Sequence, residues 1–196
     1  MTLLTIVLGG VVMATQRGLG LFEQSNATAD INSRAARAVN RILQEMIGSG
    51  PLVPAPPVFW GSATADFQLA TGWAAGEATW GPTRRIGFEY QAGELDNGID
   101  DNGNGLVDEG SVVLTEDVGG LEERRVVLVN GVSELLQGEF ANGADDNGNG
   151  LRDEAGLSFA MEDDTLVVRL SLERIGPDGN LMVRTQTVSM RLRNGG

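Results

Sequence analysis

The chain of 196 residues contains no cysteine, no histidine and no lysine, so all 14 of its basic residues are arginine. Without cysteine no disulfide can form, and cysteine pairing gives no information on the redox compartment. The lack of cysteine and histidine also excludes the usual zinc ligands, thiol nucleophiles and the imidazole base of hydrolytic triads. We therefore expect a protein that is not an enzyme.

Positive charge is scarce where negative charge is dense. Residues 91–156 contain 16 of the 27 acidic residues but only 3 of the 14 arginines, and the remaining 11 acids and 11 arginines balance. The whole formal net charge of −13 therefore lies in this one segment. Binding of nucleic acid needs a basic surface, so no nucleic-acid partner is predicted. A cation is the partner that this charge pattern favours.

The first 15 residues carry no charged side chain, and Arg17 follows them. A secretory signal peptide would start with basic residues and end at a small-residue cleavage site, and this segment has neither feature. We interpret it as the start of a processed protein. As a helix, residues 1–22 would span about 33 Å, which is long enough to cross a bilayer with Arg17 near one interface.

Residues 21–47 continue as an amphipathic pattern without a proline. One stripe consists of Ala35, Val39, Ile42 and Met46. Ala36, Leu43 and Ile47 lie beside it, and the other side carries Asp30, Arg34, Arg37 and Arg41. Glycine and proline at 48–51 then end the helix. The pattern predicts one helix over residues 1–50, whose first part, residues 1–22, needs lipid or other helices around it.

Residues 51–196 are predicted to form a head rich in β-strands. Residues 51–85 are interpreted as an extended surface connection, with Trp60, Trp73 and Trp80 packing it against the sheet; an exposed tryptophan patch for binding is the alternative. Strands are expected at 86–91, 111–116 and 124–130. The turn 176–180 joins a hairpin whose apolar side packs on the helix and whose other side faces solvent. The predicted fold class is α+β, with a long N-terminal helix on an antiparallel sheet.

An internal repeat is the clearest local pattern. Residues 97–109 recur as residues 142–154, with 11 of 13 positions identical. We number each loop from Asp100 or Asp145 as position 1. Asp or Asn side chains, which carry oxygen, then stand at positions 1, 3 and 5, and glycine stands at position 6, where a calcium loop turns sharply. Backbone carbonyls at position 7 and the acidic pair that follows could complete each site. The predicted ligands are Asp100, Asn102, Asn104, Leu106, Asp108 and Glu109 in the first loop, and Asp145, Asn147, Asn149, Leu151, Asp153 and Glu154 in the second.

These acidic loops, 96–110 and 142–156, differ from an EF-hand because the acidic pair stands at positions 9 and 10 and no helices flank the loop. They resemble the short Asp/Asn-rich calcium loops of thrombospondin type 3 repeats and of bacterial extracellular proteins. Two Ca²⁺ sites are predicted, with dissociation constants of about 10⁻⁴ to 10⁻³ M. Two alternatives are a pair of solvated Asn-Gly turns and a carboxylate-based hydrolase. The second is disfavoured because glycine-rich loops lack the burial that tunes a catalytic pKa.

Met1-Thr2-Leu3-Leu4, followed by an apolar run and an amphipathic continuation, resembles the mature N-terminus of type IV pilins and type II secretion pseudopilins. Within that family the larger minor pilins and J-type pseudopilins are the most similar, because segments 124–132 and 188–194 resemble two of their strands. Thr5 departs from the family, which usually has a glutamate there that pairs with the N-terminal amine of a neighbour.

The resemblance implies a pilin-like fold and a structural subunit of an extracellular filament at the cell surface. The subunit would lie in the inner membrane before assembly, and would then join copies of itself, or other pilins, in a helical array. The assembly contacts that it implies involve Met1, Leu3, Leu4, Thr5, Ile6 and Leu8. In this interpretation calcium stabilises the head. The alternative function is a membrane-anchored, calcium-dependent binding module for adhesion.

Overall fold

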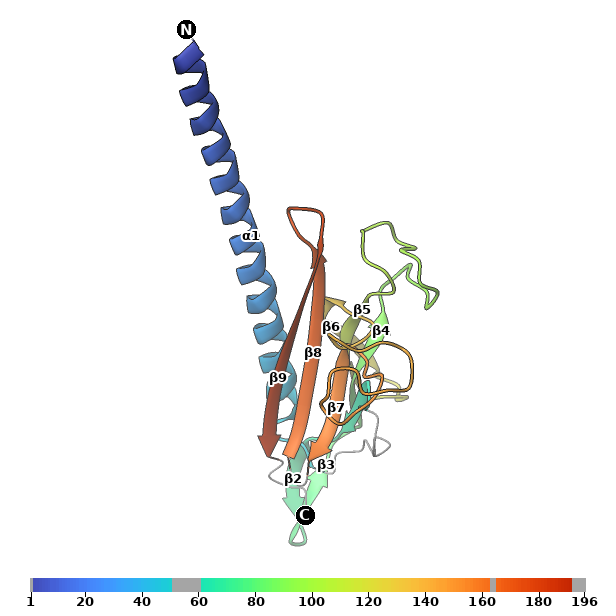
Figure 1. Ribbon diagram of the computed structural model, residues 1–196. Coiled ribbons are helices and arrows are strands. Elements are labelled where there is room, and N and C mark those ends of the chain that lie inside the picture. The colour runs from blue at the N-terminus through green and yellow to red at the C-terminus, as the bar shows by residue number, and fades with distance from the viewer. Residues whose placement is uncertain (1, 51–60, 163–164, 192–196) are drawn as a thin grey trace.

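The computed structural model describes residues 2–50, 61–162 and 165–191, and in the helix it describes the side chains of Met13 and of the residues from Thr15 onward. The fold is α+β: the long helix α1 (Thr2–Met46) lies along a curled antiparallel sheet (Figure 1). The strands are β1 (Thr64–Phe67), β2 (Ala70–Ala74), β3 (Glu77–Trp80), β4 (Arg84–Tyr90), β5 (Gly110–Glu116), β6 (Arg124–Val132), β7 (Leu157–Glu162), β8 (Thr165–Ile175) and β9 (Leu181–Arg191).

The main sheet has seven strands in the order β1-β4-β5-β6-β8-β7, with β9 paired to β8. One edge of β8 pairs with β9 along its whole length, and the other edge pairs with β7 and, through Val132 and Leu172, with β6. Ser62 and Phe159 exchange two backbone hydrogen bonds of 3.0 and 2.8 Å, which bring the β1 end of the sheet to β7. The sheet therefore curls around its own apolar side, and β2 and β3 form a separate hairpin at the end of the head farthest from the N-terminus (Figure 1).

The concave apolar side of the sheet packs against the second half of α1. Ala35, Val39, Ile42 and Met46 are all buried, which confirms the predicted stripe. They share one cluster with Phe67, Phe159 and the residues Leu166, Val168, Leu170 and Leu172 of β8. The helix ends as predicted, since the Ser49 N–H donates to the Met46 carbonyl at 2.9 Å and the chain turns away. The long helix and the C-terminal hairpin were thus both predictable from the sequence.

Three expectations for the head were wrong. Residues 51–85 were predicted to be an extended surface connection; residues 51–60 lie outside the described residues, and residues 61–85 contain β1 and the β2–β3 hairpin. Trp73 is 75% exposed and does not pack on the sheet, whereas Trp80 lies against Gly50; Trp60 lies outside the described residues. The outer side of β8 does not face solvent, because Ser171 and Glu173 on it are buried. The chain between β6 and β7 covers this side of β8: the Gln137 N–H donates to Ser171 Oγ at 3.0 Å, and the Ser171 N–H donates to the Gly156 carbonyl at 2.7 Å.

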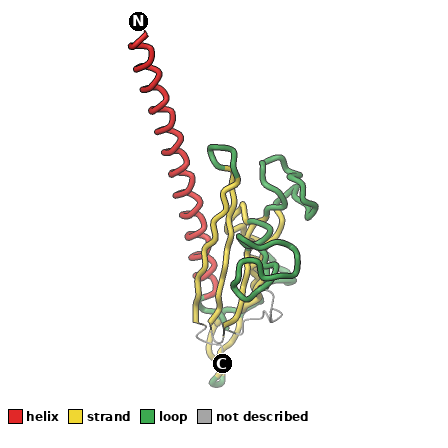
Figure 2. The backbone as a smooth tube through the Cα atoms, viewed as in Figure 1, coloured by secondary structure: helices red, strands yellow, loops and turns green. Residues whose placement is uncertain are grey.

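The first half of α1 extends beyond the head (Figure 2). Residues 15–23 are all exposed. Gln24 is the first partly buried residue of the helix, and its side-chain amide nitrogen lies 3.8 Å from the sulfur of Met182. Met1 lies outside the described residues, and the side chains of the other predicted assembly residues, Leu3, Leu4, Thr5, Ile6 and Leu8, are not described. Their role stays a prediction. Across the described residues, no helix is both long and apolar enough to cross a membrane.

Candidate metal centre

The two acidic loops connect neighbouring strands of the head. Loop 1, residues 91–109, joins β4 to β5, and loop 2, residues 133–156, joins β6 to β7. Figure 1 shows both loops projecting from the head on the side away from α1. Matching glycines adopt positive φ in the two loops, with Gly105 at 91° and Gly150 at 92°. The repeated sequence therefore folds into a repeated backbone.

The aspartate at position 1 organises each loop through backbone hydrogen bonds. Asp100 Oδ1 accepts from Gly103 N–H (2.6 Å) and Asn104 N–H (3.1 Å), and Asp100 Oδ2 accepts from Gly105 N–H (2.7 Å). Asp145 accepts the three equivalent bonds, at 2.7, 3.1 and 2.8 Å. These hydrogen bonds lower the pKa of Asp145, and the bond from the Gly150 N–H has the largest effect. Both aspartates thus hold their loops in one conformation, because each carboxylate accepts three backbone hydrogen bonds.

The asparagines at positions 3 and 5 use their oxygens for local turns, and the side-chain nitrogens of Asn102, Asn104 and Asn149 donate to the last glutamate of their loop. Asn104 Oδ1 accepts from Leu106 N–H at 2.8 Å, while Asn104 Nδ2 donates to Glu109 Oε1 at 2.5 Å. Asn102 Nδ2 also donates to Glu109 Oε1, at 2.8 Å. In loop 2, Asn149 Nδ2 donates to Glu154 Oε2 at 2.5 Å, while Asn149 and Asn147 accept from Leu151 N–H and Asn149 N–H. The buried glutamates are thus the groups on which the asparagine side chains converge.

The neighbouring aspartates, Asp108 and Asp153, bind the start of their own loops. Asp108 accepts from Asn97 N–H (3.1 Å) and Gly98 N–H (2.7 Å), and Asp153 accepts the equivalent bonds from the start of loop 2. Both adopt positive φ, 52° and 43°, which is strained for a residue other than glycine. The two aspartates therefore close the loops, and in each loop the glutamate of the acidic pair is the partner of the asparagine at position 5.

Two further buried glutamates were missed by the sequence analysis. Glu94 Oε1 accepts from Asn102 N–H at 2.8 Å, and Glu139 accepts from Asn147 N–H and Asp153 N–H, both at 3.1 Å. Glu94 and Glu139 are 45 residues apart, as are the loops, so the repeat runs over residues 93–109 and 138–154 with 13 of 17 positions identical. This Gly-Glu pair upstream of each Asn-Gly was the signal that could have identified them.

An additional acidic cluster joins two aspartates of loop 1 to a glutamate at the start of loop 2. Carboxylate oxygens of Asp96, Asp108 and Glu134 lie within 4.8 Å of one another. Burial and then the charges of Asp96 and Asp108 raise the pKa of Glu134. Burial, with the same three charges, raises the pKa of Tyr90 to about 12. Of these groups only Asp108 was predicted as a ligand, and Ala141 replaces Asp96 in the second copy.

The donors in both loops suit a hard cation. Carboxylate and amide oxygens are the ligands that calcium prefers, and an asparagine can offer its oxygen by a half turn of its amide. Glu109 is fully buried, and among the described residues its Oε2 has no hydrogen-bond partner. A buried carboxylate oxygen without a partner is costly, so a cation would stabilise it. The residues present therefore fit calcium, and the ligand set stays a prediction.

Comparisons of the chain with protein-family models, with curated proteins and with solved structures found no match.

Proposed function

We propose that this protein is a non-enzymatic structural subunit of an extracellular, type IV pilus-like filament, in which copies assemble through the N-terminal helix. The head would face the surrounding medium, and calcium in the two acidic loops would stabilise it. The proposal gives separate roles to the helix and to the loops.

The observation that carries the proposal is the exposed apolar segment of α1 before Gln24. Its described side chains before Gln24 are all exposed, and four large apolar ones are between 58% and 73% exposed: Met13, Leu19, Leu21 and Phe22. An exposed apolar stretch of helix is costly in water and marks a surface that another molecule covers. Packing against the helices of neighbouring copies would bury it.

Two glycines in the same segment support close packing of helices. A Cβ added at Gly18 or Gly20 would meet no described atom within 4 Å, so the head gives no steric reason for either glycine. Each costs about 1 kcal/mol of helix stability relative to alanine. Small residues allow helix backbones to approach closely, which offsets such a cost in an assembly.

Calcium has a stabilising role in this proposal. Each loop holds several carboxylates close together on a glycine-rich backbone, which is entropically costly to order. A divalent cation in each loop would reduce the repulsion between these charges and fix the loop. In a chain without cysteine, metal ions would cross-link the loops where disulfides cannot.

The test is to shear surface material from the producing cells and to image it by cryo-electron microscopy. We expect helical filaments whose core consists of packed α1 helices and whose outer density fits the head. Leu21→Asp and Phe22→Asp place a charge on the exposed apolar segment and should abolish filaments while the head stays folded.

Asn26→Asp is the matched control, because it adds the same charge at an exposed position of the same helix and should leave filaments intact. Filaments containing this chain only at one end would reduce its role to that of a minor subunit. If the chain occurs only as isolated membrane-bound copies, the filament proposal fails and the calcium-dependent adhesion module replaces it.

A further inference from the structure

The last glutamate of each repeat, Glu109 or Glu154, is fully buried, yet the two glutamates have different surroundings. Each accepts a 2.5 Å hydrogen bond from the asparagine at position 5 of its own loop. Because sequence and backbone otherwise repeat, the two carboxylates form a matched pair within one molecule. Any difference in their behaviour must come from the four positions at which the copies differ and from the strands around them.

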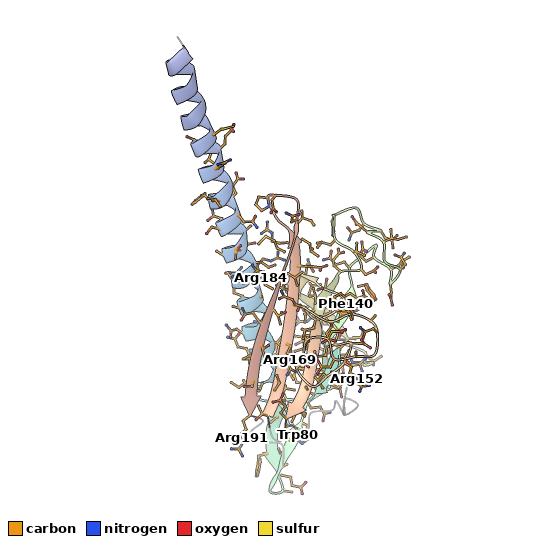
Figure 3. The ribbon with its side chains drawn as sticks, in the orientation of Figure 1. Trp80, Phe140, Arg152, Arg169, Arg184 and Arg191 are labelled. Atoms are coloured by element: carbon orange, nitrogen blue, oxygen red, sulfur yellow. The ribbon has the colours of Figure 1, made fainter. Side chains whose placement is uncertain are left out.

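Loop 2 has positive charge beside its glutamate. Glu154 Oε1 accepts a hydrogen bond from Ser158 Oγ at 3.1 Å and lies 3.7 Å from Arg169 Nη1. The side chain of Arg169, on β8, is only 11% exposed, so little solvent screens this ion pair. A second arginine, Arg152, lies within loop 2, and its charge acts on Asp145. Figure 3 labels both arginines, one at the loop and one on the strand.

Loop 1 offers its glutamate no such partner. Glu109 Oε1 accepts from two asparagine amides, and Oε2 is buried without a hydrogen-bond partner among the described residues. The charge of Glu109 instead adds to the effect of burial in raising the pKa of Glu173 on β8. The charge of Glu109 is thus felt by a carboxyl group on β8, whereas Glu154 lies beside an arginine on the same strand.

Two arginines that share a cavity with loop 1 have partners outside the loop. A cavity of about 540 Å³ lies between loop 1, β6, β8 and α1, and Arg34 and Arg174 line it. Arg174 pairs with Asp30 at 2.7 Å, and Arg34 donates to the Asn130 carbonyl at 3.0 Å. The loop sequences also differ in charge: residues 93–109 contain six acidic residues and no arginine, whereas residues 138–154 contain five acidic residues and one arginine.

We propose that the two loops are unequal calcium sites, in which Glu109 completes a tighter site in loop 1 and Arg169 weakens the site in loop 2. This inference rests on the calcium role proposed above. A buried carboxylate without a counter-charge gains strongly from a cation. A carboxylate that already pairs with an arginine gains less, and the arginine repels the incoming ion.

The test is calorimetric titration of the full-length chain, kept monomeric in detergent, with calcium chloride. We expect two binding events whose dissociation constants differ by about tenfold or more. Glu109→Gln should remove the tighter event and Glu154→Gln the weaker one. Arg169→Met should tighten the weaker event toward the other. The control is Arg184→Met on β9, which removes the same charge away from both loops and should leave the two constants unchanged.

Thermal unfolding in the presence of a chelator gives a second readout, in which the two glutamate variants should shift the melting temperature in opposite directions. Glu109→Gln removes an uncompensated buried charge and should raise the melting temperature. Glu154→Gln leaves Arg169 with only the exposed Glu162 as an ionic partner and should lower it. Equal affinities, loss of the tighter event in Glu154→Gln, or shifts of the same sign would each overturn the inference. Absence of any calcium binding at millimolar concentration would overturn the calcium role as well, so the two failures are distinguishable.

Discussion

At the scale of single residues, the two loops show how similar positions come to have different energies. Gly105 and Gly150 occupy the same place in the repeat and have nearly the same φ, 91° and 92°. A Cβ at Gly105 would lie 3.1 Å from Ile175 Cγ1, whereas at Gly150 it would meet no described atom within 4 Å. Loop 1 is therefore packed against the end of β8, and loop 2 is open at the equivalent point.

This pair yields a prediction about loop packing. Gly150→Ala should cost about 1–2 kcal/mol of unfolding free energy through backbone strain alone. Gly105→Ala should cost about 1 kcal/mol more, because the added methyl group crowds Ile175. Urea unfolding of the two variants measures the difference. Equal losses would show that the contact with Ile175 contributes nothing.

Glu173 gives a pH-dependent prediction. Burial, together with the charges of Glu109 and Glu134, raises its pKa from an ordinary 4.5 to about 6, although Ser133 hydrogen-bonds to it and opposes the shift. The folded state then holds this proton more tightly than the unfolded state. Its contribution to stability is fully present below pH 4.5 and is lost as pH rises through 6.

In the absence of divalent ions, Glu173→Gln should therefore raise the free energy of unfolding at pH 7 by up to about 2 kcal/mol. It should also flatten the stability profile between pH 4.5 and 6, which denaturant melts at several pH values would measure. A variant that loses stability at pH 7 would contradict the assignment.

At the scale of elements, α1 is joined to the head by its apolar stripe and by a chain of charged groups at its C-terminal end. Arg84 on β4 donates to Glu45 of the helix at 3.0 Å and also pairs with Glu116 on β5. Arg124 on β6 donates to Glu116 at 2.8 Å and is the main cause of the lowered pKa of Glu116. This network links one helix to three strands, and the side chain of Arg84 at its centre is only 13% exposed.

Arg84→Met should therefore destabilise the fold by about 1–3 kcal/mol, because it leaves two partly buried carboxylates without their shared cation. The neighbouring Arg85→Met is the control: Arg85 pairs with Asp66 at the surface, and its loss should cost less than about 1 kcal/mol. Chemical unfolding of both variants provides the comparison. A loss at Arg85 as large as that at Arg84 would refute the importance of the network.

At the scale of the whole molecule, the chain separates two surfaces. The apolar segment of α1 extends from one end of the head, while the acidic loops project on the side away from the helix (Figure 1). Assembly through the helix would therefore leave the loops exposed to the medium and its ions. The helix would provide cohesion between copies, and the loops would provide calcium-dependent stability within each copy.

Removal of calcium should thus open the loops without unfolding the core. Chymotrypsin should cut after the exposed Leu95 and Phe140, at the starts of the two loops, about tenfold faster in a chelator than in calcium. Leu121, fully exposed in the turn between β5 and β6, is the internal control, and cleavage there should be independent of calcium. Mass spectrometry of the fragments assigns the sites, and equal acceleration at Leu121 would indicate global unfolding.

The sequence alone determined the parts of this protein that short-range interactions build. The helix follows from apolar residues three and four apart. The tight turns within each loop follow from bonds that span three to five residues, such as those of Asp100 and Asp145. Hairpin β8–β9 was predictable for the same reason, since a five-residue turn joins two alternating strands. Such patterns can be read from the sequence because their partners are neighbours in it.

Only the tertiary structure decided what lies against these local units. Strands β1 to β3 depend on pairing and packing partners that their own short sequences do not specify, and the outer side of β8 is buried because loop 2 covers it. The loops themselves repeat, but Glu154 meets Arg169 and Glu109 does not, because β8 reaches each loop at a different point. Charge and burial act through space between residues far apart in the chain, so two nearly identical sequences acquire different electrostatics.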